Sequence, residues 1–193
     1  MNEPVRIVSY RDARREIRAA DLGLVRATSF SPTSSAIGAF GRSDYSHALF
    51  LDFWDFVPMV LESREWVGSR AVTLKSQVQR YPGAIHVYRP RLSDDQAEAC
   101  AVKARQMLGQ PYDYQAILAM WLLRVPGYRM AFRADTRDGG ETIEGAKHCS
   151  RFYSAAIELG CGEDPVPHLA GKFTEPGDLA RSAFFRPLFA LVP

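Results

Sequence analysis

The sequence predicts one domain that combines β-strands with α-helices, and three observations lead to this class. Short apolar and aromatic runs that favour strands recur over the first half of the chain. Longer runs with apolar residues three and four positions apart, which are typical of amphipathic helices, dominate the second half. The chain has 193 residues, enough for one sizeable core. We therefore divide it into an N-terminal arm over 1–20 and a single domain over 21–193.

The composition excludes several classes of function. With 47% hydrophobic and 24% charged residues, the chain is an ordinary globular sequence. Its net charge of +2 is too small to indicate a nucleic-acid or membrane-surface binder. The three cysteines are far apart in the sequence and odd in number. They do not make a disulfide framework, so we expect free thiols and a reducing compartment.

No stretch of the sequence is typical of a membrane span or an export signal. The apolar window 48–61 is interrupted by Asp52, Asp55 and Pro58, and the window 116–123 is too short to cross a bilayer. The first residues lead into an arginine-rich segment without an apolar core. We therefore expect no transmembrane segment and no secretory signal, and synthesis in the cytoplasm.

The first part of the chain alternates predicted strands with loops. Residues 10–20 carry alternating charge and alanine and predict a short exposed helix or arm. Residues 21–26 form a compact apolar run, which predicts the first strand. The segment 29–41 is rich in Ser, Pro and Gly and predicts a loop, with or without a short helix over 34–40. Residues 52–58 predict a turn or loop with aromatic anchors.

The strand predicted over 45–51 carries the first candidate for chemistry. Side chains alternate along a strand, so Tyr45 and His47 share one face. The next apolar run, 59–63, contains one acidic residue, Glu62. If the two runs pair antiparallel, Glu62 lies beside His47, where a carboxylate orients an imidazole and stabilises its protonated form. The alternative is a carboxylate in water at the rim of the sheet.

The middle of the chain predicts one strand and one well-delimited helix. Residues 67–78 are weakly patterned, whereas 84–89 predict a strand on which His86 has a structural or surface role. Ser93 starts a capping box, and the helix that follows ends at a glycine. Cys100 lies within the apolar stripe of this helix, so we expect it to be buried and inert.

The last third predicts a second helical run over 117–122, a long loop over 124–146 and an apolar tail that packs as a final strand. Loops of that length inside a compact domain are often binding or lid segments. Cys161 falls in a Gly-Pro-rich stretch with His168 nearby. Two such groups without further ligands make a poor metal site, and no other cluster has zinc-like spacing, so we expect no metal.

A helix with one buried face is predicted over 151–160, with Gly160 as its stop. Cys149 then lies at or just before the first turn of that helix. The unpaired N–H groups and the positive end of the helix dipole favour a thiolate there, and a thiolate is a nucleophile. The alternative is a small apolar residue buried at the helix start.

The order of these signals resembles that of the circularly permuted NlpC/P60 hydrolases, in particular the YiiX/YebB-like group. The resemblance covers about 21–182 and rests on the ordered set rather than on any one motif. The segments that carry it are Asp-Leu-Gly-Leu-Val at 21–25, Tyr-Ser-His at 45–47, the strand with Glu62, Val-Tyr-Arg-Pro at 87–90, Gly-Gln-Pro-Tyr-Asp at 109–113, Cys-Ser at 149–150 and Asp-Leu-Ala-Arg-Ser at 178–182.

The resemblance implies a papain-like α+β fold in which an antiparallel sheet or partial barrel packs against helices, and permutation places the histidine strand before the cysteine helix. It implies that Cys149 is the nucleophile, His47 the general base and acid, and Glu62 the polar third member. Tyr45 then either lines the site or donates to an oxyanion, together with the backbone N–H of Cys149. It implies no metal and no organic cofactor.

One departure from the family concerns the residue before the cysteine. Many relatives have an apolar residue there, whereas this chain has His148. The imidazole need not face Cys149, and we expect a surface role in preference to a catalytic one.

Three functions remain open on the sequence. The first is a cysteine amidase or endopeptidase acting on peptidoglycan stem peptides, delivered to the cell wall with a phage particle or a secretion apparatus. The second is a lipid-directed acyl hydrolase or acyltransferase, and the apolar residues available to line its acyl site are Phe30, Phe40, Trp54, Phe56, Trp121 and Leu122. The third is a non-catalytic module of a larger assembly.

Overall fold

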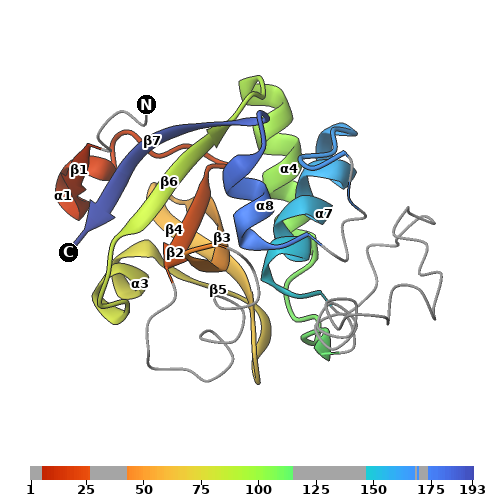
Figure 1. The fold of residues 1–193 in the computed structure, drawn as a ribbon, viewed down its shortest axis with the longest axis horizontal. Coiled ribbons are helices and arrows are strands. Elements are labelled where there is room, and N and C mark those ends of the chain that lie inside the picture. Colours follow the sequence, from red (N-terminus) through yellow and green to blue (C-terminus); the bar gives the residue numbers. More distant parts are fainter. Residues whose placement is uncertain (1–5, 27–42, 115–146, 168, 170–173) are drawn as a thin grey trace.

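The structure, a computed structural model, describes residues 6–26, 43–114, 147–167, 169 and 174–193. Its architecture is α+β, as predicted: an open seven-stranded sheet in the order β1-β7-β6-β2-β3-β4-β5 packs against helices (Figure 1). The strands are β1 (Ile7–Ser9), β2 (Leu22–Arg26), β3 (Tyr45–Trp54), β4 (Val57–Arg64), β5 (Gly68–Thr73), β6 (Ile85–Pro90) and β7 (Phe185–Val192). The helices are α1 (Tyr10–Ala13), α3 (Leu74–Arg80), α4 (Asp94–Gln106), α7 (Cys149–Cys161) and α8 (Pro176–Arg181).

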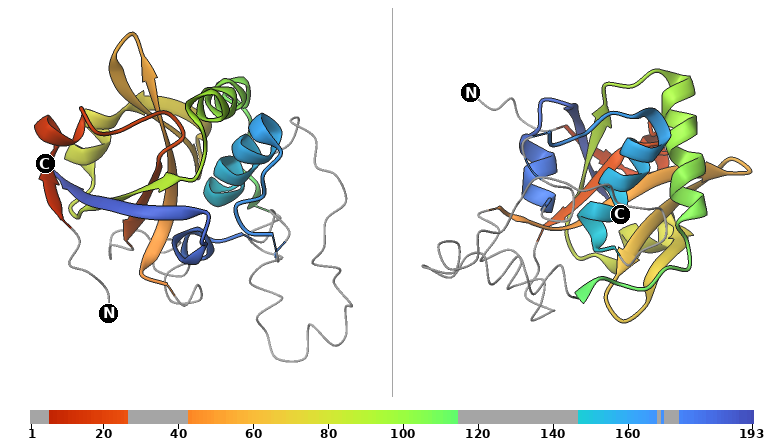
Figure 2. Two further views of the ribbon diagram at one scale, coloured as in Figure 1. Left: turned by 90° about the horizontal axis from the view of Figure 1, so that it is seen from above. Right: turned by 90° about the vertical axis from the view of Figure 1, so that its right-hand side faces the viewer.

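Every pairing in the sheet is antiparallel except that of β1 with β7. The sheet is strongly curved, and α4 and α7 lie side by side against it (Figure 2). Buried side chains of β2, β3, α4 and α7 form one core between the sheet and these helices. A second core lies on the other face, under α1 and α3.

The β3–β4 hairpin is longer than the two strands predicted at 45–51 and 59–63. Both strands continue to a two-residue turn at Asp55 and Phe56, and both residues of that turn have positive φ. Asp52, which the sequence placed in a turn, is buried within β3. Its carboxylate accepts from Nε and Nη2 of Arg105 on α4 at 2.7 Å each. The ion pair with Arg105 allows the charged Asp52 to be buried inside the strand. The sequence pattern alone does not indicate that Arg105 is its partner.

The helix predicted after Ser93 is confirmed as α4, including its capping box, but it ends at Gln106, three residues before the predicted stop at Gly109. The cysteine helix is confirmed as α7, with Cys149 as its first residue. The predicted stop at Gly160 is wrong, because α7 continues to Cys161 and ends at Gly162, whose φ is 75°. A left-handed residue is the usual way for a helix to end, and glycine adopts it at little cost.

The N-terminal segment, from residue 6 on, is not the exposed arm that the sequence predicted. β1 pairs with β7, and Ala13 and Ile17 are buried in the second core. The alternation of charged residues with Ala and Ile in this segment is therefore the pattern of a half-buried element.

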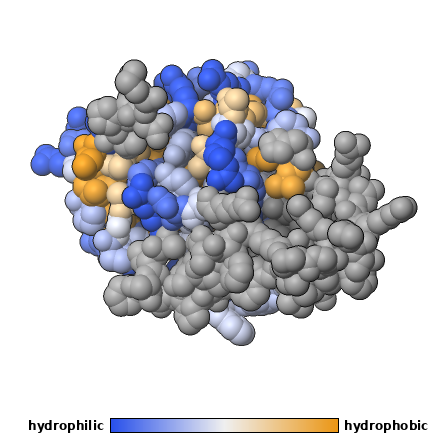
Figure 3. Space-filling view, viewed as in Figure 1, coloured by the Kyte–Doolittle hydropathy of each residue, from blue (hydrophilic) through white to orange (hydrophobic). Residues whose placement is uncertain are grey.

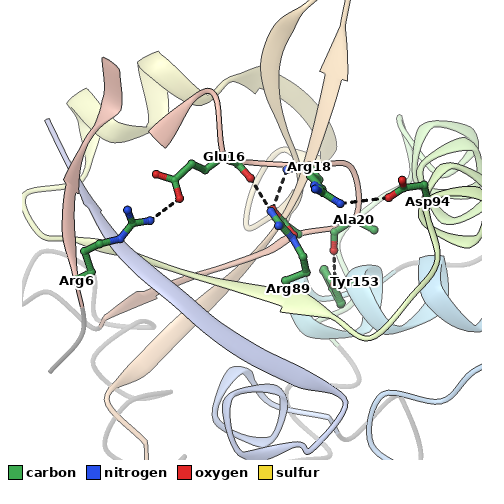
Figure 4. A network of polar contacts seen from close by, with 8 residues as sticks. Arg6, Glu16, Arg18, Ala20, Arg89, Asp94 and Tyr153 are labelled. Atoms are coloured by element: carbon green, nitrogen blue, oxygen red, sulfur yellow. Dashed lines mark hydrogen bonds and ion pairs between the residues drawn. The ribbon is translucent and has the colours of Figure 1, made fainter. Parts of the chain in front are cut away.

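A network of polar contacts holds this segment against the sheet (Figure 4). The buried carboxylate of Asp21 accepts from Arg89 Nε at 2.9 Å and Nη2 at 2.8 Å, and from the backbone N–H of Arg18 at 2.8 Å. Arg89 also donates to the carbonyl of Glu16. The Tyr153 hydroxyl, on α7, donates to the carbonyl of Ala20.

Several predictions lie outside the described residues: the loop at 29–41, the helical run at 117–122, the loop at 124–146 and the place of His168. Within the described part of the chain, no helix combines the length and the hydropathy needed to cross a bilayer. The described apolar residues visible in Figure 3 form small areas separated by polar ones.

Candidate active site

The first turn of α7 is fixed by contacts from two other parts of the chain. The Ser63 hydroxyl, near the end of β4, donates to the carbonyl of Lys147. The backbone N–H of Lys147 donates to the carbonyl of Pro111 at 3.4 Å, and the helix then begins with a bond from Phe152 N–H to His148 C=O at 2.8 Å. Cys149 is consequently held at the helix N-terminus with only 4% of its surface exposed.

His47 and Glu62 meet as the antiparallel pairing predicts. β3 pairs with β4 in a register that sets Phe50 opposite Leu61, which brings Glu62 diagonally next to His47. His47 Nε2 lies 2.6 Å from Glu62 Oε2, and the side-chain exposures are 16% for the imidazole and 0% for the carboxylate. The alternative of a carboxylate in water at the rim is therefore wrong.

Two further residues hold the Glu62 carboxylate. Arg70, directly opposite Glu62 on β5, donates to Oε1 from Nε at 2.9 Å and from Nη2 at 2.6 Å. Gln77, buried on α3, donates to Oε2 at 2.8 Å. Burial alone would raise the pKa of Glu62, but its hydrogen bonds and charge interactions with His47 and Arg70 lower it to about 2. Glu62 is therefore an anion at every physiological pH.

Cys149 and His47 shift the pKa of one another in opposite directions. Burial would raise the pKa of the thiol, but the charges of His47 and His148 and hydrogen bonds from both lower it well below its ordinary value. Burial would lower the pKa of His47, but the charges of Tyr81 and Cys149 and hydrogen bonds to Cys149 and Glu62 raise it well above the ordinary value. The favoured state is a thiolate–imidazolium pair.

His148 differs from the surface role that the sequence predicted. It is 2% exposed, caps the start of α7 without a side-chain cap bond, and contributes to the low pKa of Cys149. The sequence indicates the burial of His148 in one way: His148 directly precedes Cys149, and Cys149 was expected at the start of a helix with a buried face.

Two tyrosines lie near the site in different ways. The Tyr45 hydroxyl is 3.1 Å from His86 Nδ1 and 3.0 Å from the Tyr88 hydroxyl, so it is engaged by β6. Burial raises the pKa of Tyr112, and so does the negative charge of Cys149, which places its phenol close to the thiolate. Tyr45 thus stays a predicted lining or oxyanion residue, and Tyr112 is a neighbour of Cys149 that the sequence did not single out.

The predicted acyl-lining residues are only partly described. Trp54 and Phe56 are exposed at the β3–β4 turn. Trp54 follows His47 by seven residues along β3, a separation of roughly 23 Å in an extended strand. These two aromatic residues therefore do not line the site around His47. Phe30, Phe40, Trp121 and Leu122 lie outside the described residues.

Comparison with known proteins gives a match in structure but none in sequence. No family model matches the sequence, and no curated protein matches it. Among solved structures, YiiX from Escherichia coli O157:H7, described as a metalloprotein, aligns with a TM-score of 0.66 over 91% of this chain and 98% of that chain, at 16% identity. The chain therefore has the fold of YiiX.

The residues of this site do not fit a metal ion. Within the described ranges, no group of three or more His, Cys, Asp or Glu side chains is arranged to hold one. Nε2 of His47 and both carboxylate oxygens of Glu62 are already bound by one another or by donors from Arg70 and Gln77. The chemistry of the site is accordingly derived from the side chains themselves.

Proposed function

We propose that this chain is a cysteine hydrolase of the permuted NlpC/P60 type, which cleaves an amide bond through a thioester intermediate. The observation that supports it best is the buried line Cys149–His47–Glu62, in which charges and hydrogen bonds favour thiolate and imidazolium. A nucleophile, a base and an orienting carboxylate in that order are the parts that acyl transfer requires.

The mechanism follows from these groups. The Cys149 thiolate attacks the amide carbonyl, and the backbone N–H of Cys149, at the N-terminus of α7, donates to the oxyanion. The His47 imidazolium gives its proton to the leaving amine. Neutral His47 then takes a proton from water, which attacks the thioester and releases the acid. The carboxylate of Glu62 stabilises the imidazolium and holds the ring, as Arg70 and Gln77 hold Glu62.

Peptidoglycan stem peptides are the substrate class we propose, by analogy with the permuted family. Such a substrate is reached by delivery to the cell wall, with a phage particle or a secretion apparatus as the carrier. Fractionation of producing cells tests this part, because a protein that stays entirely in the cytosol would count against it.

The activity is tested by incubating the purified chain with muropeptides and following amide cleavage by mass spectrometry. We expect products one water heavier in sum than the substrate, absent with Cys149→Ala and present with Cys161→Ala, a change at the opposite end of the same helix. Release of fatty acid from a lipid ester without muropeptide cleavage would move the proposal to acyl hydrolysis. Cleavage that survives Cys149→Ala would refute the cysteine mechanism.

A further inference from the structure

The two cysteines outside the candidate active site are brought together where α4 packs on α7. Cys100 lies in the middle of α4 and is fully buried, and Cys161 is the last residue of α7 and partly exposed. Both thiols donate to the same acceptor, the carbonyl oxygen of Ile157, at 3.8 Å from Cys100 Sγ and 3.2 Å from Cys161 Sγ. Although the two cysteines are 61 positions apart in the sequence, their sulfur atoms converge on one oxygen.

Gly160 explains how the helices come this close. A Cβ at this position would lie 2.4 Å from Cys100 Cα and 2.8 Å from Cys100 Sγ. The backbones are therefore in contact here, and only glycine fits between them. Burial raises the pKa of Cys100, as do the charge of Cys161 and a hydrogen bond between the two thiols. Cys161, which is partly exposed, is thus the thiol that a reagent in solution can reach.

We propose that Cys100 and Cys161 are a redox-active thiol pair that closes to a disulfide under oxidising conditions and ties α4 to the last turn of α7. This site is separate from the proposed hydrolase centre. Cys149 begins the same helix, 12 residues before Cys161, a distance of about 18 Å along the axis. The cross-link therefore leaves Cys149 free.

The reaction with a small disulfide such as oxidised glutathione balances in two exchanges. The Cys161 thiolate attacks one sulfur of glutathione disulfide and expels glutathione thiolate, which leaves Cys161 joined to glutathione. The Cys100 sulfur then attacks Cys161 Sγ, its proton passes to the second departing glutathione, and the protein disulfide forms. Two protein thiols are oxidised and one glutathione disulfide is reduced to two thiols.

The test uses the full chain carrying Cys149→Ala, so that the outcome does not depend on the proposed hydrolase chemistry. The protein is treated with oxidised glutathione, the remaining thiols are blocked, and peptides are analysed by mass spectrometry without reduction. We expect one cross-linked peptide pair containing Cys100 and Cys161. Because a disulfide restricts the unfolded chain, the oxidised protein should melt roughly 5–10 °C above the reduced one, and dithiothreitol should reverse the shift.

Two further variants in the same background serve as controls. Cys161→Ala and Cys100→Ala should each give no cross-link and no redox-dependent change in melting temperature. If one of these variants fails to fold, the peptide map of the Cys149→Ala protein still shows whether Cys100 and Cys161 are cross-linked. Recovery of both cysteines as free thiols, or of Cys161 joined only to glutathione, would overturn the proposal.

Discussion

Two buried carboxylates at different places in the sheet, Glu62 and Asp21, have similar surroundings and different consequences. Each is fully buried, and each accepts two hydrogen bonds from the guanidinium of an arginine on a neighbouring strand, Arg70 for Glu62 and Arg89 for Asp21. The remaining partners differ. Asp21 accepts from a backbone N–H in the N-terminal segment, whereas Glu62 accepts from Gln77 and meets the imidazole of His47.

The difference shows what makes a buried ion pair a candidate for chemistry. Arg89, the partner of Asp21, ties β6 to the N-terminal segment through the carbonyl of Glu16 (Figure 4), and burial raises the pKa of Asp21 despite this arginine. The Glu62 network ends on a titratable ring that touches a thiol, and it lowers the pKa of Glu62 to about 2. Burial and a hydrogen-bonded arginine are common to both carboxylates. The imidazole and the thiol are therefore what make the Glu62 network a candidate for chemistry.

The largest expected effect is on turnover. Glu62→Gln keeps the size of the side chain but removes the charge that stabilises protonated His47, and we expect kcat to fall roughly 10²- to 10⁴-fold. Asp21→Asn makes the same change in the other network and should leave kcat within about threefold. Steady-state kinetics on the cleaved muropeptide compare the two. Equal losses in both variants would mean that the networks are not functionally distinct.

A second expected effect is on the stability of the Asp21 network. Asp21→Asn replaces one of the two oxygens that accept from Arg89 by an amide N–H₂ that faces the guanidinium, so a buried hydrogen bond is lost and the free energy of unfolding should fall by about 1–3 kcal/mol. Urea unfolding followed by circular dichroism measures it. The rate of Cys149 alkylation should not change in this variant, and a change greater than about threefold would show that Asp21 acts on the active site.

Glu62 and Asp21 should change the free energy of unfolding in opposite directions as the pH is lowered, because their pKa shifts have opposite signs. The pKa of Glu62 is about 2 in the folded chain against 4.5 for the free group, so its stabilisation is complete above pH 4.5 and is lost as the pH falls toward 2. The shift corresponds to roughly 3 kcal/mol. Asp21, whose pKa is raised, acts in the opposite direction. Urea unfolding at a series of pH values should therefore show a flatter acid limb for Glu62→Gln, but not for Asp21→Asn.

The smallest expected effect comes from the arginines. Arg70→Lys exchanges a guanidinium that donates twice to Glu62 for a single ammonium donor, so Glu62 is held less firmly and kcat should fall about 3- to 10-fold. Arg89→Lys is the matched change beside Asp21. Arg89→Lys should leave both kcat and the pH profile of kcat unaltered, and a loss of kcat equal to that of Arg70→Lys would show that Arg70 has no special role in holding Glu62.

The sequence was sufficient to bring His47 and Glu62 together, because alternation along two adjacent apolar runs fixes which side chains are neighbours. It was not sufficient for the residues that hold Glu62. Arg70 and Gln77 lie on β5 and α3, within the stretch 67–78 whose pattern is weak because the side chains of β5 are only partly buried after its first two residues. The prediction of an exposed N-terminal arm is wrong for a related reason, since the small buried residues of this segment alternate with charged ones.

Gly160 illustrates a limit of another kind. Glycine ends helices and also permits close helix contacts, and only the position of α4 decides between the two roles. Likewise, the sequence gives no sign that Cys100 and Cys161 meet, because their proximity depends on how two separate helices pack.

We propose that Cys149 is a thiolate because His47 lies beside it. We would measure the pH dependence of alkylation at Cys100, Cys149 and Cys161 in the fully reduced protein, using iodoacetamide, a reagent small enough for a thiol that is 4% exposed. We expect Cys149 to be labelled well below the ordinary thiol pKa of about 8.5, and the pH at which it is labelled to return toward that value in His47→Ala. Labelling of Cys149 no faster than that of Cys161 at low pH, or unchanged by His47→Ala, would contradict it.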